Sequence, residues 1–171
     1  MITFFTSQHE RHAPEFEFFR GERVPCFENP GRAAFVRGEL AARGHELRSP
    51  THDSAGLLPR VHARRYLDFL RSAWSQWVGL DPANEKVQPF PSVWPVRTLR
   101  SDVEPADFVA RLGLYSMDNG TPLVAGTWDA VKAAADAAVS AAAVLGSGAG
   151  SAFSATRPPG HHAGPDFMGG Y

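Results

Sequence analysis

The apolar positions at the start of the chain predict a short buried strand. Residues 2–5 read Ile-Thr-Phe-Phe, a run that favours β structure, and a polar, aromatic-rich loop is expected after it. Asn29 followed by Pro30 is typical of a helix start, because the asparagine can cap free amides and proline suits the first turn. That helix is expected to end at Gly44, where a left-handed residue is favoured.

A second helix is predicted to begin near Pro59. Its apolar residues recur at three- and four-residue steps, so they share one stripe that faces the core: Leu67, Leu70, Trp74 and Trp77. Between residues 79 and 126 this periodicity is lost, and proline and aromatic residues are frequent. So long a stretch without clear elements is uncommon inside a compact domain. It is either an insertion with a function or an excursion without one.

An alanine-rich segment from Ala130 to Leu145 predicts a third helix. Thr127 can cap this helix, and Asp129 is placed to stabilise its positive end. Residues 151–156 then predict a strand. Strand, helix, helix, long loop, helix and strand form an α/β pattern, which indicates a parallel sheet flanked by helices. In such sheets, functional sites form beyond the carboxyl ends of the strands.

Composition and charge narrow the classes of function. The 171 residues suit one domain, and 43% hydrophobic with 20% charged residues is typical of a soluble globular protein. The net charge of -1, with both signs mixed along the chain, gives no support for a nucleic-acid or membrane partner. Residues 1–6 lack the features of a signal peptide. Cys26 is the only cysteine, so we expect no internal disulfide, a cytoplasmic location and a packing role for this thiol rather than a nucleophilic one.

The candidate chemistry follows the last predicted strand, in the run Arg-Pro-Pro-Gly-His-His from Arg157 to His162. In a plain strand, neighbouring side chains point to opposite faces, so two adjacent imidazoles could not serve one site. The Pro-Pro-Gly segment fixes two φ angles and then allows a reversal, which could bring both rings to one cavity. One ring could then accept a proton from water while the other assists the leaving group. A surface loop, or one core histidine beside an exposed one, is the alternative.

The same run carries a resemblance to a known family. Arg-Pro-Pro-Gly-His-His-Ala-Gly, from Arg157 to Gly164, with Gly169-Gly170-Tyr171 after it, closely resembles the signature of the histone deacetylase and acetylpolyamine amidohydrolase family. The resemblance extends over nearly the whole chain. Further segments are similar to the acetylpolyamine branch: Gln8-His9, Val24 to Glu28, Arg32-Ala33, Val61-His62, Tyr66-Leu67, Phe69-Leu70, Trp94 to Arg97 and Ala125 to Trp128.

The resemblance implies a three-layer, arginase/deacetylase-like α/β fold and a zinc-dependent hydrolysis of N-acetyl amides. It implies that His162 is the general base and that His161 is its electrostatic partner, which helps to stabilise the transition state. Gly170 and Tyr171 match residues that line the narrow channel for the substrate. The expected substrate is a small acetylated amine such as an acetylpolyamine.

The segment 79–126 resembles an insertion of the polyamine branch that supports a homodimer and overhangs the mouth of the active site. Asp118 lies in this segment, at a place similar to an acidic position that contacts the substrate, and its carboxylate could attract a cationic polyamine. Its alternative role is that of a loop carboxylate that caps the turn before Asn119-Gly120.

The sequence also departs from the family pattern. In the family, the zinc ligands, the oxyanion-binding tyrosine and the aspartates that orient the histidines lie downstream of the point where this chain stops. We therefore expect residues 1–171 to be the N-terminal part of a single, apparently truncated deacetylase domain. No zinc ligand is expected within this part, which should be inactive alone. Two alternatives remain: a non-catalytic small-molecule or protein-binding module derived from the fold, and a manganese-dependent relative, against which the Pro-Pro-Gly-His-His run argues.

Overall fold

The apolar run at the start of the chain forms the central strand of a parallel sheet. The computed structural model describes residues 1–99 and 102–171. In it, β1 (Ile2–Phe5) lies between β4 (Glu46–Arg48) and β5 (Ala152–Ala155), and both pairings are parallel. The predicted strands at residues 2–5 and 151–156 and the predicted parallel sheet are confirmed.

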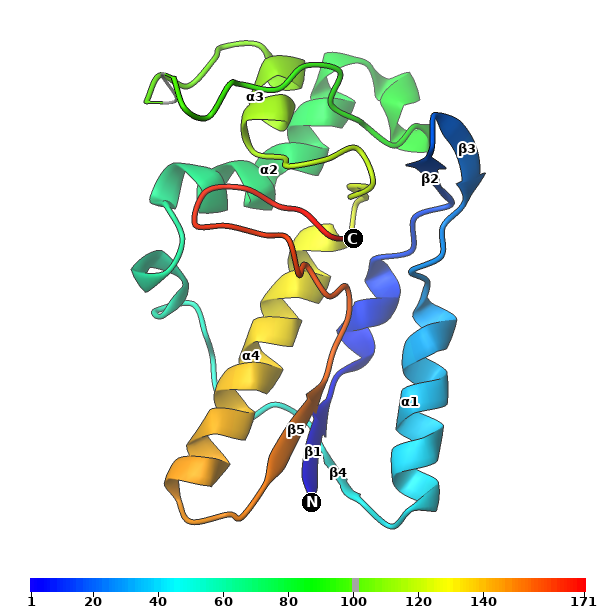
Figure 1. The fold of residues 1–171 in the computed structure, drawn as a ribbon, viewed down its shortest axis with the longest axis vertical. Coiled ribbons are helices and arrows are strands. Elements are labelled where there is room, and N and C mark those ends of the chain that lie inside the picture. Colours follow the sequence, from blue (N-terminus) through cyan, green and yellow to red (C-terminus); the bar gives the residue numbers. More distant parts are fainter. Residues whose placement is uncertain (100–101) are drawn as a thin grey trace. The chain divides into compact units, whose positions relative to one another are not determined.

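Two helices cover the faces of this sheet. Figure 1 shows the three strands between α1 (Pro30–Ala42) and α4 (Thr127–Gly146). Phe4 of the central strand packs against Ala137 and Ala141 of α4. The small alanine side chains allow the helix to lie close to the strands. This three-layer arrangement confirms the predicted fold class.

Helix α1 begins and ends where local signals place its limits. The Asn29 side chain accepts a hydrogen bond from the backbone amide of Gly31 at 3.0 Å, and Pro30 is the first helical residue. After the helix, Gly44 adopts a left-handed φ of 72°. Its amide donates to the carbonyl of Ala41 at 2.9 Å, which completes the predicted helix end.

Helix α4 begins without the cap that the sequence predicts. Thr127 is its first residue, Gly126 precedes it, and no side chain caps this end. The Thr127 hydroxyl instead lies 3.0 Å from Nδ1 of His12, and both residues are buried. The predicted Thr127 cap is therefore wrong, because a contact with a distant residue takes up this hydroxyl. Asp129 lies in the first turn as predicted and forms an ion pair with Arg11 at 2.7 Å.

The predicted loop after the first strand contains structure of its own. A 3-10 helix spans Ser7–Arg11, and an antiparallel hairpin joins β2 (Phe16–Phe19) to β3 (Glu22–Pro25). Arg20 and Gly21 form its turn with positive φ angles of 53° and 84°. The available sequence signal for this hairpin was the pair Arg20-Gly21, which lies between two runs that favour β structure.

The second helix starts later than predicted. Helix α2 spans Arg64–Leu80, and Pro59 lies in a short 3-10 helix, Leu58–Arg60, that precedes it. Leu67 and Leu70 are buried, as the stripe predicts. The other two members of the stripe, Trp74 and Trp77, are half-buried.

The segment 79–126 is less irregular than the sequence suggests. It contains a 3-10 helix, Pro82–Lys86, and a helix α3, Phe108–Leu114. Asp107 caps α3 by accepting a hydrogen bond from the amide of Ala110 at 2.9 Å. Positions 100 and 101 of this segment lie outside the described residues.

The described residues form two compact units, each assembled from three stretches of chain. The first unit holds the parallel sheet with α1 and α4, and the second holds the hairpin, α2 and α3. Their limits are Met1–Ala13, Glu28–Leu58 and Gly126–Pro158 for the first unit and Pro14–Phe27, Pro59–Ala125 and Pro159–Tyr171 for the second.

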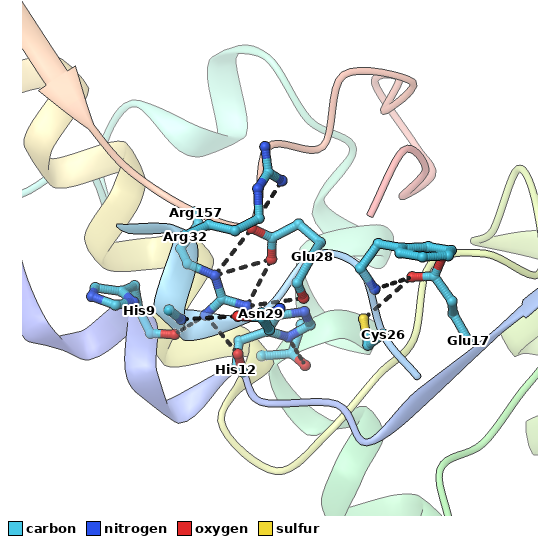
Figure 2. A network of polar contacts seen from close by, with 11 residues as sticks. His9, His12, Glu17, Cys26, Glu28, Asn29, Arg32 and Arg157 are labelled. Atoms are coloured by element: carbon cyan, nitrogen blue, oxygen red, sulfur yellow. Dashed lines mark hydrogen bonds and ion pairs between the residues drawn. The ribbon is translucent and has the colours of Figure 1, made fainter. Parts of the chain in front are cut away.

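A buried ion pair organises the polar interior of the first unit (Figure 2). Arg157, which is 3% exposed, donates from Nη2 to Oε2 of Glu28 at 2.7 Å. Its Nη1 donates to the carbonyl oxygens of His9 and His12. A buried charge is tolerated when it is paired and when its donors are satisfied. Arg157 therefore connects the chain after β5 to residues 9–12 and to the start of α1.

The sole cysteine of the chain is buried in the second unit. Cys26 is 8% exposed, and its Sγ donates to Oε2 of Glu17 at 3.3 Å. Figure 2 shows the sulfur directed at this carboxylate. A buried thiol of this kind is shielded from reagents, in agreement with the packing role expected for Cys26.

Because His9 and His12 are buried, we expect the chain to lose stability in mild acid. Burial, together with the nearby Arg157 guanidinium, lowers the pKa of His12 to about 4, and the same two causes lower the pKa of His9. An unfolded histidine titrates near 6.5, so it gains a proton that the folded chain excludes. The free energy of unfolding is therefore highest above about pH 6.5 and decreases as the pH falls towards 4. For His12 the loss is about 2 kcal/mol at roughly pH 5.

This loss can be measured by urea unfolding of the wild type and of His12→Gln near pH 7.5 and pH 5. Glutamine can keep a hydrogen bond to Thr127 but cannot gain the proton, so His12→Gln should lose less stability on acidification. His52→Gln, at an exposed position, is the matched control and should behave as the wild type. An equal acid sensitivity in His12→Gln and the wild type would contradict the assignment to His12.

Candidate functional site

The turn after β5 brings the two neighbouring imidazoles together. The ring centroids of His161 and His162 are 4.0 Å apart, with 59° between the ring planes. Gly160 adopts a left-handed φ of 63°, and its carbonyl accepts a hydrogen bond from the amide of Ala163 at 3.0 Å. Both histidines are exposed to solvent. The two rings lie together, as predicted, whereas a shared cavity and a catalytic role stay predictions.

Backbone hydrogen bonds connect the histidine turn to residues 169–170. The amide of His162 donates to the carbonyl of Gly169 at 3.2 Å, and the amide of Gly160 donates to that of Gly170 at 3.1 Å. Gly170 is buried and has a φ of 76°. A Cβ at this position would lie 2.7 Å from the amide nitrogen of His162 and 2.8 Å from Nδ1 of His161. The site therefore requires glycine at position 170.

Gly170→Ala is expected to move both imidazoles and to destabilise the chain. The left-handed backbone alone costs a residue with a Cβ roughly 1–2 kcal/mol. Urea unfolding measures this cost, and the imidazole NMR signals of His161 and His162 report the displacement. Gly79→Ala, in α2, is the control, because a Cβ there meets nothing within 4 Å. Unchanged imidazole signals in Gly170→Ala would show that the contact is not formed.

Asp118 uses its two carboxylate oxygens for different contacts. Oδ1 accepts hydrogen bonds from the amide of Gly120 at 3.0 Å and from the hydroxyl of Thr121 at 2.8 Å. Oδ2 accepts from the amide of Gly170 at 3.2 Å and lies 3.7 Å from Nδ1 of His162. The turn-capping role is thus present in the structure, and the same side chain reaches the histidine pair. Contact with a substrate stays a prediction.

A short backbone pairing aligns Asp118 with Gly170. The amide of Met168 donates to the carbonyl of Tyr115 at 2.8 Å, and the amide of Met117 donates to the carbonyl of Met168 at 2.8 Å. These bonds form a parallel bridge between Ser116 and Met168. Tyr171 is the remaining predicted site residue, and its ring centroid lies 5.7 Å from the ring centroid of His161. The structure therefore brings all five predicted site residues together: Asp118, His161, His162, Gly170 and Tyr171.

A set of contacts beside this site was not predicted from the sequence. Arg97 contacts the backbone at Leu114 and the side chains of Asp166 and Phe167. Phe167 in turn packs against Gly164, where a Cβ would lie 2.4 Å from its ring. The available signals were the similarity of Trp94 to Arg97 to the acetylpolyamine branch and the charged residue that ends this run.

The described residues do not fit a zinc ion. Within residues 1–99 and 102–171, no group of three or more histidine, cysteine, aspartate or glutamate side chains could hold a metal ion. A zinc site in a protein needs three or four such ligands. Among the helices that the structure describes, none combines the length and the apolar character needed to cross a membrane.

Comparisons with known proteins show what the chain is similar to. Residues 26–171 match the family model described as "Histone deacetylase domain". The chain is 40% identical over 172 residues to acetylpolyamine amidohydrolase 2 of Pseudomonas aeruginosa. It is 33% identical over 172 residues to the acetylpolyamine amidohydrolase of Mycoplana ramosa. Both alignments cover 100% of this chain and 49% of the relative. The chain thus spans about half the length of the curated relatives it matches.

Solved structures show the same fold. The crystal structure of an acetylpolyamine aminohydrolase from Burkholderia pseudomallei matches with a TM-score of 0.89 and 29% identity, and the match covers 99% of this chain and 48% of the other. The HDA15 HD domain matches with a TM-score of 0.63 at 18% identity over 99% of this chain and 38% of the other. This second likeness supports the fold alone.

Proposed function

Because the chain belongs to the histone deacetylase domain family, as the resemblance in its sequence indicates, we propose that it carries the histidine pair of an amidohydrolase. The proposed reaction removes acetyl groups from small acetylated amines such as acetylpolyamines. The observation that supports this most is the juxtaposition of His161 and His162, with ring centroids 4.0 Å apart. Two imidazoles at this distance, both open to solvent, suit the proton transfers of amide hydrolysis.

We assign complementary roles to the two rings. His162 acts as the general base that takes a proton from the attacking water. His161 provides positive charge beside the developing oxyanion and assists the departure of the amine. Gly170 leaves room for the pair, since a Cβ there would meet the backbone nitrogen of His162 and the ring of His161. Zinc dependence, which the family resemblance implies, needs ligands that the described residues do not offer, so no step is assigned to a metal.

We assign the recognition of the amine to Asp118 and Tyr171. The Asp118 side chain is 32% exposed and carries a negative charge next to the pair, which favours a cationic amine. The Tyr171 ring beside His161 offers an apolar wall to the methylene linker of the substrate.

We further propose a cytoplasmic homodimer formed through the segment 79–126. Apolar side chains on this segment are exposed, with Val96 at 62%, Leu99 at 75% and Val103 at 57%. Exposed apolar residues in one segment are typical of an interaction surface. Light scattering of the purified chain tests this proposal, and a monomer at all concentrations would contradict it.

A chimera tests the proposed reaction. Residues 1–171 replace the matching part of the Pseudomonas aeruginosa acetylpolyamine amidohydrolase 2, to which they are 40% identical. We expect the chimera to hydrolyse an acetylated diamine, whereas residues 1–171 alone, supplied with zinc, should show no hydrolysis. A folded but inactive chimera would favour the alternative, a binding module without catalysis. Zinc-dependent hydrolysis by residues 1–171 alone would show that the chain contains ligands that we have not identified.

A further inference from the structure

The guanidinium of Arg97 touches two stretches of chain that are far apart in the sequence. On one side, its Nη2 donates to the carbonyl of Leu114 at 2.9 Å and to that of Ser116 at 3.4 Å. On the other side, its Nη1 lies 3.5 Å from Oδ1 of Asp166. The guanidinium carbon also lies 4.0 Å from the centroid of the Phe167 ring. One side chain thus joins residues 114–116 to residues 166–167.

These two stretches continue directly into the candidate site. Just beyond the Arg97 contacts, the amide of Met168 donates to Tyr115, and the amide of Met117 donates to Met168. The next step along both stretches is the contact between Oδ2 of Asp118 and the amide of Gly170. Displacement of one stretch relative to the other would therefore change the position of Asp118 relative to the pair.

The contacts of Arg97 need an arginine rather than a positive charge alone. A planar guanidinium can donate to two carbonyls, face a carboxylate and lie on an aromatic ring at the same time. A lysine ammonium offers a point charge and cannot stack in this way. Oδ2 of Asp166 also lies 3.9 Å from Nη2 of Arg65, so the Asp166 carboxylate keeps a charged partner when position 97 is changed. The distinctive contribution of Arg97 is therefore the link between the two stretches.

We propose that Arg97 is a positioning residue of the candidate site: it fastens residues 114–118 to residues 164–170 and so holds Asp118 and Gly170 against the histidine pair. The proposal gives the segment 79–126 a role in holding the site. It rests on the proposed function only for what the site does, because the link itself is a property of the folded chain.

Amide hydrogen exchange in residues 1–171 tests this link without any assay of activity. In Arg97→Gln, we expect exchange at the amides of Met117, Met168 and Gly170 to rise by about 10-fold or more, the factor for a lost hydrogen bond to a charged group. Amides in the middle of α2, such as that of Leu70, should keep the wild-type rate. Arg97→Lys should show most of the same local rise. Arg43→Gln, on an exposed pair of α1, removes the same charge and should leave all of these amides unchanged.

Each other result overturns the proposal. Wild-type exchange at the three amides would show that Arg97 does not hold the stretches together. An equal rise in α2 would show a general loss of stability, and full protection in Arg97→Lys would show that charge alone suffices. Absence of hydrolysis by the chimera would count against the proposed function and would leave the exchange result intact, so the two failures can be told apart.

Discussion

Replacement of His162 by alanine in the chimera is expected to lower kcat by about 10²- to 10⁴-fold, the usual contribution of a positioned general base. The methyl group cannot accept the proton of the attacking water, and no other imidazole among the described residues shares this turn except His161. His161→Ala should also lower kcat, because the charge beside the oxyanion is lost. KM for the acetylated diamine should change far less than kcat in both variants.

The matched control is His52→Ala, which removes an exposed histidine of the first unit and should retain the activity of the chimera. Circular dichroism must show that all variants are folded. If His162→Ala keeps more than roughly a tenth of the kcat, the general-base role is wrong. If His161→Ala is inactive while His162→Ala is active, the two roles are exchanged.

Arg157→Met is expected to destabilise the chain by about 3–5 kcal/mol, the cost of breaking a buried ion pair by removal of one partner. Glu28 would remain buried, with Arg32 at 3.5 Å as a neighbour that is itself 59% exposed. The carbonyl oxygens of His9 and His12 would also lose the Arg157 donor, although that of His9 would keep the amide of His12 at 3.2 Å. Urea unfolding near pH 7.5, where His12 is neutral, measures the loss without interference from acid.

Two further variants separate charge burial from simple loss of an arginine. Arg157→Met combined with Glu28→Leu should recover part of the stability, because no unpaired carboxylate is then buried. Arg43→Met, which breaks an exposed pair on α1, should cost about 1 kcal/mol or less. Equal effects of Arg157→Met and Arg43→Met would contradict the importance of the buried pair.

The elements that the sequence predicts correctly have local causes. Helix α1 follows from Asn29, Pro30 and Gly44, whose effects depend only on nearby backbone. Strand β4 was missed because all three of its residues are exposed, so no apolar pattern marks it, and pairing with β1 holds it in place. The hydroxyl of Thr127 was assigned to a cap because the sequence cannot show that His12 lies beside it.

The same distinction applies to the site. The convergence of His161 and His162 could be predicted because proline and glycine fix the turn between them and the strand. Asp118 and Tyr171 came from the family resemblance alone, since no spacing rule connects positions 118 and 171. Arg97 was given no role, because its partners lie near positions 114 and 166 and only the folded chain brings them together.

Nuclear Overhauser measurements on residues 1–171 with labelled histidine test most directly whether adjacent imidazoles share one side of the chain. With ring centroids 4.0 Å apart, His161 and His162 should give strong cross-peaks between their ring protons, and His161 should give weaker ones to Tyr171 at 5.7 Å. An extended backbone would direct the two side chains to opposite faces. If no ring-to-ring cross-peak is seen while the chain is folded, the two histidines do not form a common site.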